Sequence, residues 1–248
     1  MHDDWMALKK KTVVVTGADS EFGVATARRF TLAGARVVTV SPAVDATRQS
    51  SEGLPQASGM LVAHHFVADI TTAAGAASLE SFLGSDSGQV DILVNGLHEV
   101  GEDTDPLSIA DSVLLRSFAV NVLAPYRLTR LLSARMRAGR GGSIVNVLGG
   151  SGFAVNTANT SLGAANAALW NMTRALSAEL APFVRVNAVC AGARFGDADD
   201  TGLSPAPPGT HGGPDELAEA ILYLADDSAT STTGTLLTVG RIPDAFGD

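Results

Sequence analysis

The chain has 248 residues, of which 46% are hydrophobic and 17% charged, which fits a globular protein with a sizeable core and excludes a disordered one. The net charge of −9 argues against a nucleic-acid-binding surface. The single cysteine, Cys190, excludes an internal disulfide and a cysteine-based zinc site, and we expect no metal site. No apolar run approaches the ~20 residues of a membrane span, and the charged N-terminus lacks a signal core. We therefore expect a cytoplasmic protein with no membrane or nucleic-acid partner.

The first predicted unit is a strand, a glycine turn and a helix. A polar lead over residues 1–11 precedes a β-branched strand at residues 12–16. The helix that follows ends near Ala33, and Gly34 stops it. This order of elements places a diphosphate at a helix N-terminus and begins a parallel sheet.

The glycine turn itself is altered. Gly17 and Gly23 are present, but Glu21 stands between them. A carboxylate at this point adds bulk, and at ~4 Å it repels another negative charge by about 1 kcal/mol in water and several times more when partly buried. The alternative is that Glu21 points to solvent and the turn still binds its ligand.

Short apolar strands and helical segments alternate along the rest of the chain. The further predicted strands are residues 35–40, 60–67, 90–94, 143–147, 183–189 and 235–239. The main predicted helices are residues 106–138, with a break near Pro125, residues 158–181 and residues 214–226.

Over about residues 10–241 the sequence resembles the short-chain dehydrogenase/reductase family. The resemblance rests on the Thr-Gly-x-x-x-Gly-x-Gly turn, on Asn121 within FAVNVLAP, and on the small-residue tail at residues 167–169. It implies a Rossmann-like, doubly wound α/β fold: a seven-stranded parallel sheet flanked by helices in a single domain over residues 1–248. It also places residues 191–213 at the position of a substrate lid and leaves residues 241–248 as a C-terminal tail.

The catalytic positions depart from the family pattern. In the family a serine binds the substrate carbonyl, a tyrosine supplies a proton, and a lysine lowers the tyrosine pKa and holds the nicotinamide ribose. This chain has Gly149, Leu162 and Asn166 at these positions. Glycine offers no hydroxyl, leucine donates no proton, and asparagine carries no charge. The family's asparagine survives as Asn121, which we interpret as a structural amide at a helix irregularity. We expect no catalytic residue of the family's set in this chain.

The cofactor positions are altered as well. The resemblance leaves four remnants of a dinucleotide site, and Glu21 blocks the turn that two of them form. Ser41 stands near the position of the residue that selects between NAD and NADP, and His98 lies where the cofactor would run. We therefore expect no cofactor in this chain. The remnants are Gly17, Gly23, Asp69 and Asn95. For Asp69 two roles stay open: contact with an adenine, or a cap on the next helix.

Loss of these groups on a retained scaffold predicts a catalytically inactive subunit that supports an active, NAD-dependent homologue. Hetero-oligomeric members of the family that act on hydroxyacyl-CoA substrates in aromatic hydrocarbon catabolism resemble this arrangement. We expect contact with the homologue through residues 106–138 and 158–181 and through residues 214–239. The apolar faces predicted there are Leu162, Leu169, Met172 and Leu176, and Ile221, Leu222 and Leu224.

Two alternatives from other classes remain. One is an enzyme without nicotinamide, a lyase, isomerase or cyclase that uses His98, Glu99 or Arg194. The other is a sensor that only binds a small molecule in the same pocket.

Overall fold

The structure is a computed structural model that describes residues 8–42, 64–85, 89–99, 105–153, 159–192 and 213–240. The predicted C-terminal tail, Arg194, most of the lid-like loop and most of the N-terminal lead lie outside these residues. The same holds for the first four residues of the strand predicted at residues 60–67.

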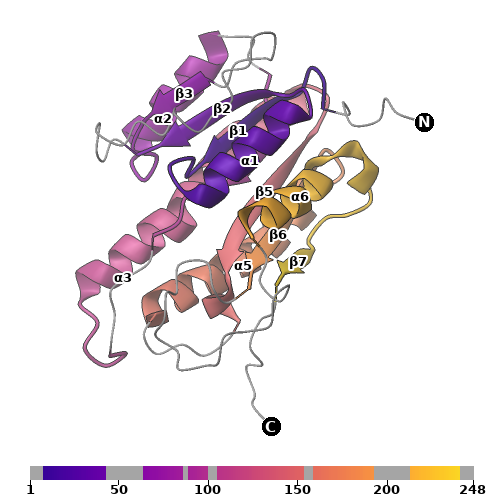
Figure 1. The fold of residues 1–248 in the computed structure, drawn as a ribbon. Helices are drawn as coiled ribbons and strands as arrows, with labels where there is room; N and C mark the ends of the chain where they lie inside the picture. Colours follow the sequence, from indigo (N-terminus) through magenta and orange to yellow (C-terminus); the bar gives the residue numbers. More distant parts are fainter. Residues whose placement is uncertain are drawn as a thin grey trace.

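Seven parallel strands form one sheet, in the order β3-β2-β1-β4-β5-β6-β7 (Figure 1). This confirms the predicted Rossmann-like sheet. The strand order reverses between β1 and β4, and in such sheets ligands bind beyond the carboxyl ends of the strands at that point. The strands are β1 (Thr12–Thr16), β2 (Arg36–Ser41), β3 (His64–Val67), β4 (Ile92–Asn95), β5 (Gly142–Gly149), β6 (Val184–Ala191) and β7 (Leu236–Val239).

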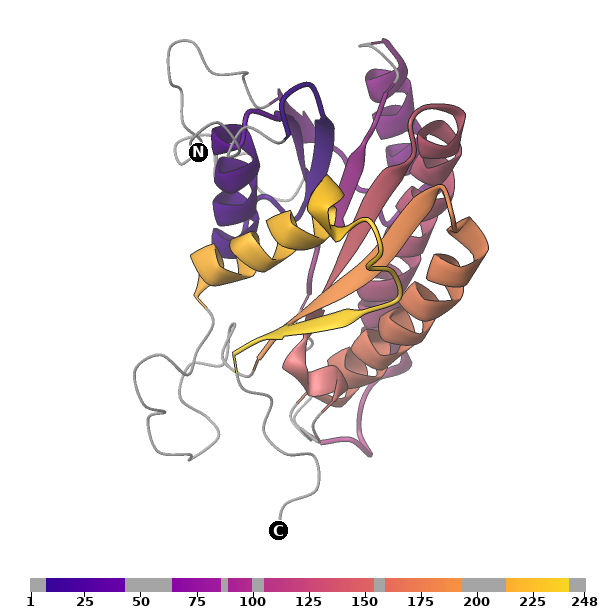
Figure 2. The same cartoon turned by 90° about the vertical axis from the view of Figure 1, so that its right-hand side faces the viewer.

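Helices cover both faces of the sheet, as Figure 2 shows. One face carries α1 (Glu21–Leu32) and α6 (Pro214–Ala225), which pack against each other. The other face carries α2 (Ala73–Ser85), α4 (Ala124–Ala138) and α5 (Thr160–Leu180). The strands serve both layers because their side chains alternate: Val13 and Val15 join the core under α1 and α6, and Val14 joins the core under α2 and α4.

The long helical stretch is irregular where it was predicted to break. It consists of α3 (Asp111–Phe118), a π-helical turn η3 (Ala119–Leu123) and α4. Pro125 lies at the start of α4 and has no amide N–H to bond to the preceding turn, so the hydrogen-bond ladder widens there. Asn121 lies within the π turn. None of the helices in the described part of the chain is long and apolar enough to cross a membrane.

Four of the seven apolar side chains predicted for subunit contact lie in the chain's own core, so these four form no exposed contact face, and contact through the helices that carry them stays a prediction. Leu162, Leu169, Ile221 and Leu224 are at most 5% exposed. Leu176 and Leu222 pack against the core clusters, and Met172 is half-buried. The reason is geometric: helical periodicity marks one apolar stripe on each helix, and on α5 and α6 the sheet covers that stripe.

The exposed large apolar side chains lie elsewhere. On the α3–α4 stretch they are Leu114, Leu115, Leu123 and Tyr126, and on α6 the exposed one is Tyr223. Leu115 is 69% exposed and Leu123 48% exposed, so the α3–α4 stretch carries apolar surface that the described residues leave uncovered.

Candidate functional site

The turn after β1 is held by contacts within the backbone. Gly17 has a φ of +71°, and a Cβ on it would lie 2.3 Å from the carbonyl oxygen of Gly96. A Cβ on Gly23 would lie 2.1 Å from the carbonyl oxygen of Gly17. Both glycines are therefore required by the packing of this chain's own backbone, with or without a phosphate in the turn.

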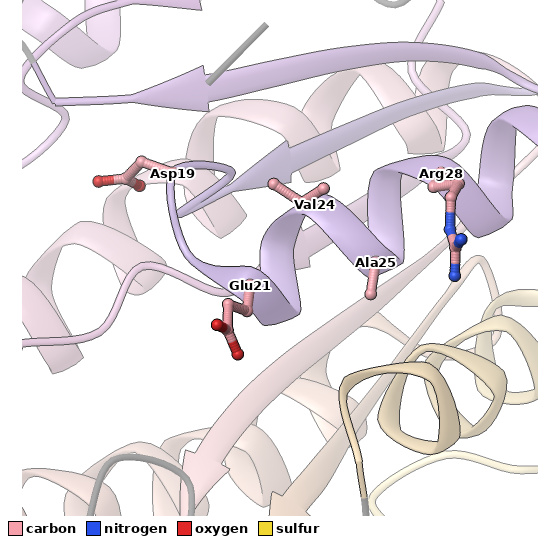
Figure 3. Close-up of a pocket in the computed structure, with 5 residues that line it drawn as sticks. All are labelled: Asp19, Glu21, Val24, Ala25 and Arg28. Atoms are coloured by element: carbon pink, nitrogen blue, oxygen red, sulfur yellow. The ribbon is translucent and has the colours of Figure 1, made fainter. Parts of the chain in front are cut away.

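Two carboxylates flank the N-terminus of α1 (Figure 3). Ser20 caps the helix, because its Oγ accepts from the Gly23 amide at 3.0 Å and donates to the Gly17 carbonyl at 2.8 Å. Asp19 and Glu21, on either side of Ser20, are both exposed. Glu21 thus points to solvent, but its charge and that of Asp19 oppose the attraction that a helix N-terminus has for anions.

Asp19 and Glu21 also line an open pocket of about 390 Å³ along α1, together with Val24, Ala25 and Arg28 (Figure 3). The charge of Arg28 is already engaged, because its Nη2 lies 2.5 Å from Asp215 Oδ1 of α6. This ion pair ties α1 to α6.

Asp69 and Asn95 make local structural contacts. Asp69 Oδ1 accepts from the Thr71 amide at 3.0 Å and from the Thr71 hydroxyl at 2.5 Å. Thr72, not Asp69, caps α2, because its Oγ1 accepts from the Gly75 amide at 3.0 Å. The carboxylate of Asp69 thus orders the turn before the helix.

Asn95 begins a buried amide chain across the sheet. Its Nδ2 donates to Asn146 Oδ1 at 2.8 Å, and Asn146 Nδ2 donates to Thr173 Oγ1 at 2.9 Å. The chain links β4, β5 and α5, so it holds the carboxyl ends of two central strands against the helix.

Asn121 binds the segment after β4. Its Oδ1 accepts from the Glu99 amide and its Nδ2 donates to the Glu99 carbonyl, both at 3.1 Å. Nδ2 also lies 3.3 Å from Ser117 Oγ. These contacts agree with the interpretation of Asn121 as a structural amide at an irregular helix.

Gly149 and Asn166 lie close together at the carboxyl end of β5, and Leu162 lies on the same helix as Asn166. Gly149 ends the strand, and Leu162 and Asn166 lie one turn apart on α5, 5% and 1% exposed. Asn166 Nδ2 donates to Ser151 Oγ at 3.3 Å, and Ser151 lies in the short 3-10 turn η4 (Gly150–Gly152). Ser151 lies two residues beyond Gly149, so its register does not match the family's serine, yet its hydroxyl lies beside Asn166.

His98 faces the same point. A Cβ on Gly149 would lie 3.1 Å from Asn166 Nδ2, 3.5 Å from His98 Cε1 and 3.7 Å from Ser151 Oγ. His98 has exposed surface, yet protein atoms surround much of its imidazole. Desolvation by burial lowers the pKa of His98 below its ordinary value, so the ring is neutral at neutral pH.

His98 and Glu99 are adjacent candidates for acid–base chemistry, but their side chains have different neighbours. Glu99 Oε2 lies 2.7 Å from Arg116 Nε of α3, on the other side of the segment. Tyr126 and Tyr223 are exposed on α4 and α6, at 37% and 52%. Among the described residues, no three His, Cys, Asp or Glu side chains are grouped as metal ligands.

Comparison with known proteins gives a consistent match. The model of a family described as short chain dehydrogenase matches residues 11–198. Galactitol 2-dehydrogenase (L-tagatose-forming) of Cereibacter sphaeroides is 34% identical over 242 residues, with 91% of each chain covered. The 7alpha-hydroxysteroid dehydrogenase of Escherichia coli K12 is 29% identical over 248 residues, with 96% of each covered.

Solved structures agree with the sequence matches. A hydroxysteroid dehydrogenase from Escherichia coli superposes with a TM-score of 0.79 at 28% identity, covering 96% of this chain and 99% of that one. A short chain dehydrogenase from Mycobacterium smegmatis gives a TM-score of 0.80 at 28% identity, covering 96% and 94%. The similarity therefore extends over nearly the whole chain.

Proposed function

The chain belongs to the short-chain dehydrogenase family, and we propose that it is a non-catalytic member that works as a subunit beside an active homologue. The observation that carries this proposal is the set of side chains at the positions that match the family's serine, tyrosine and lysine. Gly149, Leu162 and Asn166 stand there and provide neither a proton donor nor a cation. Relatives with the same fold include dehydrogenases, so the absence of these catalytic side chains is a property of this chain's sequence and not of the fold.

The described residues also fit a nicotinamide dinucleotide poorly. The His98 ring lies within contact distance of a Cβ built on Gly149. The ring therefore lies beside the carboxyl end of β5, where the nicotinamide of such a cofactor would lie. At the other end, Asp19 and Glu21 place two carboxylates beside the helix N-terminus that would receive the diphosphate. The family typically uses NAD(P); we propose that the partner, not this chain, holds it.

The subunit role needs a surface, and the exposed apolar residues of the α3–α4 stretch supply one. Leu115, Leu123 and Tyr126 are separated by eight and three residues, so they lie along one side of the helical stretch. An active homologue has the same fold and can present a corresponding helical face. We therefore move the proposed contact from the buried residues of α5 and α6 to this surface.

The degenerate subunit of 2-[hydroxy(phenyl)methyl]succinyl-CoA dehydrogenase offers a parallel that this chain resembles. By that parallel, the partner oxidises a hydroxyacyl-CoA or a similar alcohol with NAD. We propose the cytoplasm as the location, where the single buried thiol of Cys190 stays reduced.

Co-expression with an active family member of the same organism tests the subunit role. We expect the two chains to co-purify at a fixed ratio through affinity and size-exclusion steps, and the homologue to lose activity or solubility when expressed alone. A soluble, monomeric chain beside a fully active homologue would overturn the proposal.

A second candidate function is an activity or sensor role without nicotinamide. It is favoured by His98, which faces Ser151 and Asn166 instead of pairing with Glu99. Loss of a measured turnover in His98→Ala would establish an enzyme, and ligand-dependent thermal stabilisation without turnover would establish a sensor.

A further inference from the structure

The exposed side of α4 carries a row of side chains that continues the apolar surface of the α3–α4 stretch. The row begins at the last residue of η3 and runs to the last turn of α4. Its members are exposed, whereas Leu128, Leu132 and Met136 on the opposite side of the helix are buried. A spacing of three or four residues keeps the row within an arc of about 80° and gives it a length of about 21 Å. The members of this α4 row are Leu123, Tyr126, Arg130, Ala134 and Arg137.

All the charged side chains of α4 are positive. The helix contains four arginines and no acidic residue. Two of the arginines bind within the fold, because Arg127 donates to two backbone carbonyls in the turn before α2 and Arg135 pairs with Glu80. The other two, Arg130 and Arg137, belong to the α4 row.

In the part of the chain that the structure describes, neither Arg130 nor Arg137 forms an ion pair. The guanidinium of Arg137 instead lies over the ring of Phe183, 5.9 Å from its centroid, and Phe183 is 55% exposed. This contact leaves the positive charge without a counter-ion. The α4 row therefore presents two positive charges beside apolar side chains, on a chain whose net charge is −9.

A second copy of this chain is a poor partner for the α4 row. In a symmetric pair each copy presents the same surface, so two antiparallel rows that overlap fully bring Arg130 of one copy against Arg130 of the other. This follows because position 130 is the midpoint of a row that spans residues 123–137. The two guanidinium groups repel each other, and the repulsion grows as the interface excludes water. A helix that presents carboxylates meets attraction at the same point.

We propose that the α4 row docks a helix of another chain that is both apolar and acidic, and that it discriminates against a second copy of this chain. Leu123 and Tyr126 pack against the apolar residues of that helix, and Arg130 and Arg137 pair with its carboxylates. Charges in an interface determine which partner binds more than how tightly it binds. The inference rests on the proposed subunit role only for the identity of the other chain as the active homologue, and it adds the chemistry that the homologue presents.

Charge reversal in the full chain tests this discrimination. In Arg130→Glu/Arg137→Glu we expect the affinity for the homologue, measured by calorimetry, to fall by at least about tenfold, and we expect added salt to weaken the wild-type complex. The matched control is Lys9→Glu/Lys10→Glu, which makes the same change in net charge at exposed positions before β1 and should bind as the wild type does. A wild-type complex that tolerates the reversal on α4 would overturn the proposal.

A second measurement needs no homologue. A mixture of the wild type with Arg130→Glu/Arg137→Glu brings Arg130 against a carboxylate, so sedimentation velocity should show association at least about fivefold tighter in the mixture than in either protein alone. Equal association in all three samples would overturn the proposal. Binding of a DNA duplex by the wild type and not by the variant would make a nucleic acid the occupant and would also overturn it. If the mixture associates as expected but no homologue co-purifies, the subunit role fails and the discrimination by the α4 row holds.

Discussion

Cys190 shows how strongly the interior of the sheet controls reactivity. It lies in β6, fully buried, and burial raises the pKa of its thiol to about 12. At pH 8 only about one part in ten thousand is thiolate. We expect no reaction with a thiol reagent in the native protein and one equivalent in guanidinium, as read by absorbance of the released chromophore. Rapid labelling of the native chain would contradict this placement.

His98 should make stability depend on pH. Its pKa is lowered in the folded chain, so the unfolded chain binds more protons between that lowered pKa and the ordinary value near 6.5. Stability therefore rises with pH through this interval and falls as the solution is acidified from about pH 7 to about pH 5. We expect His98→Gln to show a smaller fall in Tm over this range than the wild type.

The matched control for that pH series is His64→Gln, because His64 is exposed on β3. Its fall in Tm should equal that of the wild type. An identical pH dependence in wild type and His98→Gln would show that the environment of the imidazole has been misassigned.

At the residue scale, the sequence indicates which residues stand at the family's catalytic positions, but it does not show which side chains contact one another. The tail at residues 167–169 supports the alignment that puts Gly149, Leu162 and Asn166 at the family's catalytic positions, and that alignment stays a prediction. Two adjacent residues in an irregular segment can point in different directions, and sequence does not say which. For this reason the sequence could not show that His98 lies beside Gly149 while Glu99 binds Arg116.

At the scale of elements, one side chain holds the end of α6. Arg185 of β6 donates to the carbonyl oxygens of Leu224 at 2.6 Å, Ala225 at 3.2 Å and Asp226 at 3.0 Å. A helix C-terminus leaves such carbonyls without partners, and a guanidinium satisfies several at once. We expect Arg185→Met to lower the free energy of unfolding by about 2–4 kcal/mol in urea titration.

The control for that measurement is Arg130→Met, an exposed position on α4, which should change stability by less than about 0.5 kcal/mol. Equal effects of the two substitutions would mean that the cap on α6 contributes no stability of its own.

The elements themselves were predictable because local signals agree with the fold. The β-branched run of β1, the glycine stop after α1 and Pro214 at the start of α6 all match the structure. The burial of Leu162 and Leu169 on α5 and of Ile221 and Leu224 on α6 was not predicted, for a physical reason. A single helix shows an apolar stripe, but only the sheet order decides whether that stripe meets the core or solvent.

At the scale of the whole molecule, the proposed contact with a homologue can be tested at the α3–α4 surface. Leu115 and Leu123 are largely exposed, so replacing both with Glu should leave the Tm of the isolated chain within a few degrees. The same double variant should lose co-purification with the homologue, because two charges would enter an apolar interface. A complex that forms as well as the wild type would place the contact elsewhere.

The central claim is that this chain carries the family's fold without its cofactor chemistry, and NADH titration by calorimetry tests it most directly. The positive control is a short-chain dehydrogenase that binds NADH in the same assay, and the matched variant is Glu21→Gly/His98→Gly, which removes the carboxylate and the ring that we propose oppose the dinucleotide. We predict no saturation of the wild type below about 1 mM and measurable binding in the variant. Saturable binding of NADH to the wild-type chain at micromolar concentration, with turnover of an alcohol, would contradict the claim.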